Sequence, residues 1–278
     1  MGSYPPVPEP EILPPGDGYV PPSPPVRRAR PSWASAPATY LLVAINCAVF
    51  LAMVAHGVSF RTPTTGQLMH WGADNAGSVL INGEWWRIVT AMFVHVGILH
   101  LATNMWCLWN LGLLAEPLLG TTGVLAVYIL TGAAGNLLSV FASRLMAHPG
   151  DANDAFFGSV GAGASGAVFG LAGLLIVLLK SPLLPVPPEE LKRLRKSVIY
   201  FAGINLLIGL GTILPGSFVR IDNFAHVGGC LCGLLFAVPL VPRIGAPRQL
   251  FLTRRRIAVG MVALVLTLFA FFIDQFRF

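Results

Sequence analysis

Charged residues are scarce in this sequence of 278 residues, where they make up only 11%. Ordinary soluble domains contain about 25%. Hydrophobic residues make up 55%, and the mean hydropathy is +0.71, which excludes an ordinary soluble enzyme. Lysine and arginine together number 18, against 12 acidic residues. They lie in short clusters between apolar runs, which indicates a multi-pass membrane protein and not a nucleic-acid-binding protein.

Cysteine is also rare, and its positions suggest no special chemistry. The four cysteines all fall inside apolar runs, and Cys230 and Cys232, two residues apart, point to different faces of a helix. We therefore expect no disulfide framework, no metal site and no cofactor. A cleavable signal peptide is not expected either, since residues 1–37 have no apolar core and hold 12 of the 23 prolines. This composition predicts a disordered tail, and the first span is expected to direct insertion.

Seven apolar runs are long enough to cross a bilayer, whose core of about 30 Å needs about 20 helical residues. They lie at 39–57, 97–117, 121–143, 163–180, 197–214, 223–241 and 257–274. The polar stretch 58–96 is too long for a simple connection, so we expect it to be structured at the membrane surface. The sequence thus predicts an all-α fold, a polytopic transmembrane helix bundle.

The distribution of basic residues predicts the orientation of this bundle. If the N-terminus is inside, the three inner segments hold 13 of the 18 lysines and arginines. Because short cytoplasmic segments are enriched in these residues, we expect a cytoplasmic N-terminus and, after seven spans, an outer C-terminus.

Polar residues near the outer ends of three runs are predicted to share one depth. Counting 1.5 Å per residue from the inner ends, His100 lies roughly 24 Å up, Ser165 roughly 22 Å and His226 roughly 25 Å. Polar groups at membrane depth are costly and indicate function when they face the bundle interior. Their agreement in height predicts a single site.

Glycines indicate how closely two of these runs approach. The run 163–180 contains Gly166, Gly170 and Gly173, and the run 223–241 contains Gly229 and Gly233. Small residues at this spacing allow two helix backbones to touch, which would bring Ser165 and His226 within the reach that a nucleophile and its base require. Plain helix packing would use the same glycines equally well.

The surroundings of Ser165 favour an anion-binding site. The glycine-dense stretch GSVGAGASG places Ser165 at a helix N-terminus, where free backbone N–H groups and the helix dipole can stabilise an oxyanion. A simple N-cap is the alternative. His100 and Asn104 share one helix face and can donate further hydrogen bonds, although interhelical contacts are again an alternative. Asp222 lies one turn outward of His226, which favours a dyad over a triad.

Four motifs, in this order along the chain, resemble those of the rhomboid family of intramembrane serine proteases. They are GEWWR at 83–87, HVGILHLATNMW at 95–106 with the later Gly112 and Glu116, GASG at 163–166, and AHVGG at 225–229. The resemblance covers roughly residues 70–241, and the last run is similar to the seventh span of six-plus-one members.

The resemblance implies a role for each matching residue. Ser165 would be the nucleophile and His226 the general base, with His100, Asn104 and the Ser165 amide as oxyanion donors. Four further residues would support the site: Gly163, Gly166, Phe169 and Gly229. Phe169 departs from the family's frequent tyrosine, so it offers a ring but no hydroxyl to the base.

Together these observations predict a proline-rich cytoplasmic tail at 1–37, a six-span rhomboid-like catalytic domain at 38–241, and a cytoplasmic loop with a seventh span at 242–278. The predicted protein is an integral serine endopeptidase of the plasma membrane that cleaves transmembrane proteins near their outer end. Its partners would be these substrates and the lipid bilayer, and we expect no nucleic acid among them. The sequence does not indicate an oligomeric state. Its active site would open to the extracytoplasmic side.

Three other classes of protein compete with this prediction. A catalytically inactive rhomboid-like binding or quality-control factor is disfavoured because both Ser165 and His226 are present. A membrane haem or transport protein would use His95, His100 and His226 as ligands or as a proton path. Metal-dependent and aspartyl intramembrane proteases are disfavoured, since the sequence has no HExxH motif and no aspartate in the middle of a span.

Overall fold

The computed structural model describes residues 36–146, 160–211, 221–241 and 247–275. The regular structure of these ranges is helical, apart from one isolated β-bridge, which confirms the predicted all-α fold. The prediction of a disordered tail falls almost entirely on residues outside these ranges.

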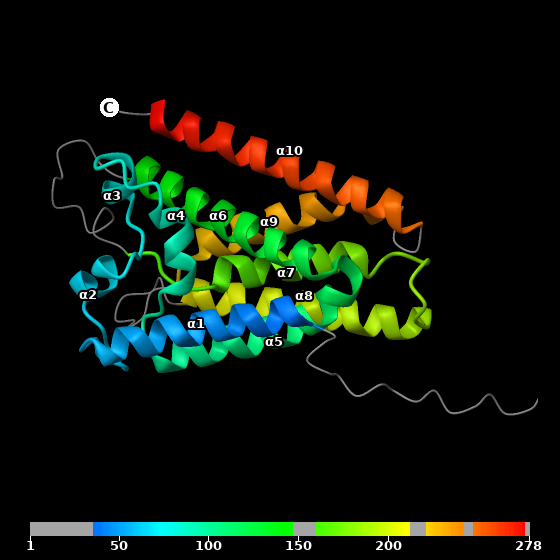
Figure 1. Cartoon of the computed structure of the whole chain (residues 1–278), viewed down its shortest axis with the longest axis horizontal. Helices are drawn as coiled ribbons and strands as arrows, with labels where there is room; N and C mark the ends of the chain where they lie inside the picture. Colours follow the sequence, from blue (N-terminus) through cyan, green and yellow to red (C-terminus); the bar gives the residue numbers. More distant parts are fainter. Residues whose placement is uncertain (1–35, 147–159, 212–220, 242–246, 276–278) are drawn as a thin grey trace, which may run out of the picture. The chain divides into compact units, whose positions relative to one another are not determined.

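Seven helices correspond to the seven apolar runs (Figure 1). They are α1 (Pro37–Ala55), α5 (Ile98–Leu119), α6 (Thr121–Met146), α7 (Ser165–Leu178), α8 (Pro188–Gly211), α9 (Asn223–Ala237) and α10 (Arg248–Gln275). Both α8 and α10 begin well before the apolar run that predicted them. The charged residues before these runs are good helix formers, and Glu189 and Glu190 in the first turn of α8 complement the helix dipole.

The helix α7 forms the centre of the bundle. It contacts α5, α6, α8 and α9, and its most extensive contact is with α9 (Figure 1). Eleven of its 14 residues are buried. A helix that is apolar on all sides is stable only inside other protein or lipid, so α7 provides the buried scaffold of the molecule.

The backbones of α7 and α9 touch along their glycines. A Cβ added to Gly229 would collide with the carbonyl oxygen of Gly166, and one added to Gly233 would collide with that of Gly170. Only glycine allows this approach, so the predicted close pairing of the two runs is confirmed.

Four helices in the described ranges are long and apolar enough to cross a membrane, namely α1, α5, α6 and α10. The apolar helices α7 and α9 have only 14 and 15 residues. At 1.5 Å per residue α7 is roughly 21 Å long, shorter than a bilayer core of about 30 Å.

A buried carboxylate ties α5 to the start of α1. Glu116 is 3% exposed and accepts hydrogen bonds from the backbone N–H of Ala38 at 2.8 Å and of Thr39 at 2.9 Å, and from the Thr39 hydroxyl at 2.7 Å. These N–H groups at a helix start have no partner within the helix, so Glu116 satisfies them and fixes α5 against α1.

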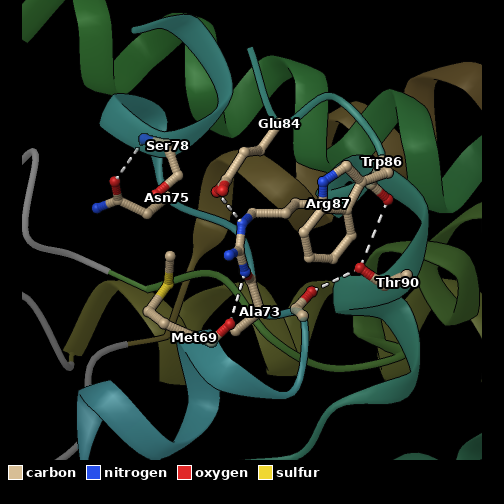
Figure 2. A network of polar contacts seen from close by, with 9 residues as sticks. Met69, Ala73, Asn75, Ser78, Glu84, Trp86, Arg87 and Thr90 are labelled. Carbon is tan, nitrogen blue, oxygen red and sulfur yellow. Dashed lines mark hydrogen bonds and ion pairs between the residues drawn. The ribbon is translucent and has the colours of Figure 1, made fainter. Parts of the chain in front are cut away.

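The stretch between α1 and α5 is structured, as predicted. It contains α2 (Thr65–His70), α3 (Ala76–Leu80), α4 (Arg87–Thr90) and the 3-10 helix η2 (Ala91–Phe93). Arg87 lies at the centre of its polar network (Figure 2). Its guanidinium donates to Glu84 at 2.6 Å, to the carbonyl of Met69 at 2.7 Å and to that of Ala73 at 2.8 Å, so one side chain holds the segment together.

Candidate active site

Ser165 is the first residue of α7 and is half-buried. The N-cap position belongs to Ala164, and no side chain caps this helix end. The alternative of Ser165 as a simple N-cap is therefore wrong. Ser165 therefore belongs to the first turn of α7, where free backbone N–H groups and the helix dipole favour an anion.

The residues before Ser165 follow a path that requires glycine. Gly163 has a φ of +125°, a conformation that strains residues with a side chain. Its N–H donates to the carbonyl of Ala91 at 2.9 Å, which attaches the segment to the start of η2. This bond and the glycine backbone set the direction in which the chain enters α7.

His100 and Asn104 lie against this segment, as their shared helix face predicted. A Cβ added to Gly163 would be 2.5 Å from Cε1 of His100 and 3.6 Å from Nδ2 of Asn104. The Asn104 amide also donates to the carbonyl of His100 at 3.0 Å. The two donors therefore lie next to the backbone that leads into Ser165.

His226 is in the first turns of α9 and is only 6% exposed. Its ring stacks on Phe169 of α7, with the centroids 4.2 Å apart and an angle of 10° between the planes. The carbonyl of the preceding residue, Ala225, would be 3.4 Å from a Cβ on Gly166. Gly166 and Ala225, the chain neighbours of Ser165 and His226, thus lie close together, and the imidazole lies nearly parallel to the ring of Phe169.

The hydrogen bonds of this region leave His226 available. Its Nδ1 is buried and has no partner within the described ranges, and no hydrogen bond joins its ring to the Ser165 hydroxyl there. Asp222 caps α9 by accepting from the Ala225 N–H at 3.0 Å and also accepts from the Ser139 hydroxyl. The Asp222 carbonyl accepts from the backbone N–H of His226 at 3.3 Å, while the hydrogen bonds of its carboxylate go to Ala225 and Ser139.

His95 is fully buried between η2 and α5. Its Nδ1 lies 3.3 Å from the Phe93 carbonyl, and its ring centroid lies 5.3 Å from that of His100. Burial, with a smaller contribution from His100, lowers the pKa of His95 to about 3. His95 is therefore neutral at ordinary pH and packs behind His100 as an uncharged group.

One polar residue next to the site was not predicted from the sequence. Asp74, between α2 and α3, forms the isolated β-bridge with Gly161, a few residues before Ser165. No spacing rule connects two positions so far apart in the sequence, so no signal pointed to it. Among the described residues, no group of three or more His, Cys, Asp or Glu side chains is arranged to hold a metal ion.

Comparison with known proteins assigns the family. A Rhomboid domain model matches residues 82–243. Rhomboid protease GluP of Bacillus subtilis is 32% identical over 211 residues, which cover 75% of this chain and 36% of that protein. Rhomboid protease AarA of Providencia stuartii is 28% identical over 253 residues, 88% of this chain and 86% of that protein.

A plant relative gives the same assignment. The mitochondrial RHOMBOID-like protein 6 of Arabidopsis thaliana is 32% identical over 188 residues, 67% of this chain and 54% of that protein. The chain thus spans most of AarA, about half of the plant protein and about a third of GluP. Together with the apolar helices, the match identifies the chain as an integral membrane protein of the rhomboid family.

Proposed function

We propose that this chain is an intramembrane serine endopeptidase that cleaves transmembrane segments of other proteins near their outer ends. The observation that carries the proposal is the meeting of three helices around the first turn of α7. His100 and Asn104 of α5 lie against Gly163, and His226 of α9 stacks on Phe169. A nucleophile, a base and oxyanion donors need this kind of arrangement.

In the proposed mechanism, His226 accepts the proton of the Ser165 hydroxyl while Ser165 Oγ attacks the scissile carbonyl carbon. The oxyanion that forms accepts hydrogen bonds from His100, Asn104 and the Ser165 N–H. His226 then donates the proton to the leaving amine, and water hydrolyses the ester on Ser165 in a second cycle. Hydrogen bonds between nucleophile and base are often long before substrate binds and shorten in the productive complex.

The environment of Ser165 supports the oxyanion step. The N-terminus of α7 supplies backbone donors and a favourable dipole, and Gly163 leaves room for His100 and Asn104 to approach them. Because α7 and the donors are held by buried packing, little reorganisation is needed when negative charge develops.

The proposal includes a topology with six spans in residues 38–241 and a seventh in 242–278. The N-terminus and the tail at 1–37 would be cytoplasmic, and the site would open outward from the plasma membrane. The cluster of basic residues at the start of α8 and of α10 supports this orientation. The shortness of α7 supports a site below the outer surface, where water enters from the loop side.

Substrate choice follows from this depth. A stable substrate helix keeps its carbonyls in hydrogen bonds, so a cleavable segment must unwind near Ser165. Glycine or serine near the outer end lowers the cost of unwinding by up to about 1 kcal/mol per residue, and proline lowers it by about 3 kcal/mol. Replacing these residues by leucine at the outer end, but not at the inner end, should slow cleavage of a transmembrane substrate in liposomes.

Labelling of the purified protein with a fluorophosphonate probe tests the nucleophile without a known substrate. We expect labelling of the wild type and of Ser197→Ala, a control on α8 whose hydroxyl bonds its own helix. We expect none for Ser165→Ala. Undiminished labelling of Ser165→Ala would exclude Ser165 as the nucleophile, and an unlabelled wild type would favour an inactive rhomboid-like binding protein.

A further inference from the structure

Asp74 links the surface segment to the chain that leads into α7. Its N–H donates to the carbonyl of Gly161 at 2.9 Å, and the Gly161 N–H donates to the carbonyl of Asp74 at 2.9 Å. Gly163, two residues further on, donates to Ala91. The segment 161–165 is thus tied to the surface segment at two points before it reaches Ser165.

The side chain of Asp74 is enclosed at this contact. The residue is 3% exposed, and its Oδ2 is buried with no hydrogen-bond partner in the described part of the chain. A Cβ added to Gly161 would collide with Oδ1, so the carboxyl fills the space beside Gly161 that a side chain there would need. The loop that carries Asp74 is held in place by Arg87, which binds the carbonyl of Ala73 (Figure 2).

Two charged groups face this carboxyl from neighbouring elements. Arg87 of α4 is positive, and Asp222 at the N-cap of α9 is negative. Burial, and then the charge of Asp222, raise the pKa of Asp74 well above its usual range, while the Gly161 N–H and Arg87 act in the opposite direction. The folded protein therefore favours the neutral carboxyl.

We propose that Asp74 is a positioning residue, which holds Gly161 and thereby sets the path of the segment 161–165 that presents Gly163 and Ser165. This inference rests on the proposed protease function, because it gives the positioned segment its role in oxyanion binding. The carboxyl acts in its neutral form. A charge on it would be buried and would be repelled by the charge of Asp222.

The sign of the pH dependence follows from the raised pKa. A group that binds its proton more tightly in the folded state stabilises the fold at low pH, and this contribution is lost as pH rises through the folded-state pKa. Turnover of the wild type should fall as pH rises through that value. Asp74→Asn keeps the shape without the ionisation, so its turnover should lack this decline.

The test compares Asp74→Asn and Asp74→Ala with Thr90→Val in the full chain, using cleavage of a transmembrane substrate in liposomes. Thr90→Val is the matched control, because it removes a hydrogen bond of 2.7 Å to Gly72 in the same loop without touching Gly161. We expect Asp74→Ala to lose about 10²-fold in turnover through misplacement of the segment. Asp74→Asn and Thr90→Val should stay near the wild type at neutral pH.

Hydrogen exchange of the segment 160–165 gives a readout that does not depend on activity. Asp74→Ala should speed exchange of the Gly161 and Gly163 amides, and Asp74→Asn should not. Gly161→Ala should reproduce the loss of Asp74→Ala, and the double variant should be no worse than either, because both act on one contact.

Three outcomes would overturn the proposal: wild-type turnover in Asp74→Ala, equal loss in Asp74→Asn and Asp74→Ala, or unchanged exchange in Asp74→Ala. Failure of the proposed function looks different. In that case the wild type neither cleaves nor binds the fluorophosphonate, while the difference in exchange between Asp74→Ala and Asp74→Asn persists.

Discussion

The helix pair α7 and α9 differs from the helix α10 in how its apolar surface is covered. In α7, 11 of 14 residues are buried against other helices, and the glycines of α7 and α9 bring their backbones into contact. In α10, which has 28 residues, only Ala258 and Ile273 are buried. Burial in α7 comes from protein, whereas most of the apolar surface of α10 is left for lipid.

This contrast distinguishes two features of a membrane-protein sequence. One is the length and hydropathy of a helix, and the other is the presence of small or polar residues at a buried contact. Length and hydropathy select α1, α5, α6 and α10; of these, α5 carries His100 and Asn104, whereas α10, the longest and most apolar, holds none of the candidate site residues. The helices that begin at Ser165 and just before His226 are too short to meet a length criterion. Small residues at helical spacing and polar residues near a helix start are therefore better indicators of a buried site than hydrophobic length.

The largest expected effect is on turnover, from loss of the proposed base in α9. His226→Ala should reduce cleavage of a transmembrane substrate by about 10⁴-fold or more, as removal of a member of such a catalytic group does elsewhere. Thr267→Ala in α10 is the control, since its hydroxyl donates to the Ala263 carbonyl of its own helix. If His226→Ala and Thr267→Ala cleave the substrate equally well, His226 is not the catalytic base, and the buried helix pair is no more important for turnover than α10.

The next effect concerns one oxyanion donor on α5. Asn104→Ala should lower turnover by about 10²-fold to 10³-fold with little change in KM, because the interaction forms only in the transition state. Asn110 on the same helix is a matched control. It is exposed and donates to the carbonyl four residues earlier, as Asn104 does. A loss of similar size in Asn110→Ala would show that both substitutions disturb the helix α5 in general and that Asn104 is not a specific oxyanion donor.

Packing gives the third effect and compares the two regions directly. Gly229→Ala places a methyl group against the backbone of Gly166. It should lower the free energy of unfolding by about 1–3 kcal/mol. Gly260→Ala in α10 has no atom within 4 Å of the added methyl, and the better helix propensity of alanine should raise stability by up to about 1 kcal/mol.

Unfolding of both glycine variants in detergent, followed by circular dichroism, measures this difference. Equal stability changes would mean that α7 and α9 separate at little cost and that the glycine contact does not hold the bundle together.

Much of the fold follows from local rules in the sequence. Apolar runs predicted α1, α5 and α6 within a few residues, because lipid demands continuous hydrophobic helix there. The starts of α8 and α10 were placed too late, since hydropathy marks where apolar residues begin and not where the backbone becomes helical. Helical spacing also predicted the shared face of His100 and Asn104, which both lie against Gly163.

Contacts between distant segments were not predictable in the same way. Glu116 belongs to the second of the four motifs, but the motif does not reveal that its carboxylate caps α1. The bridge between Asp74 and Gly161 likewise joins two irregular segments with no periodic pattern. Such contacts depend on how the helices are arranged in three dimensions, which residue spacing within one segment does not encode.

The smallest effect concerns the ring beneath His226. Phe169 stacks on the imidazole with a centroid distance of 4.2 Å, and such a contact contributes about 0.5–1.5 kcal/mol beyond simple burial. Phe169→Leu keeps an apolar side chain but loses the stacking, so turnover should fall by about 2-fold to 12-fold as the imidazole becomes less well oriented. Phe169→Tyr keeps the ring and should stay close to the wild type. The measurement is kcat for the three proteins with one transmembrane substrate in liposomes. If leucine supports full turnover, orientation of His226 comes from the contacts of α9 with α7 and not from the ring, and the role of this helix pair would then rest on its backbone contact alone.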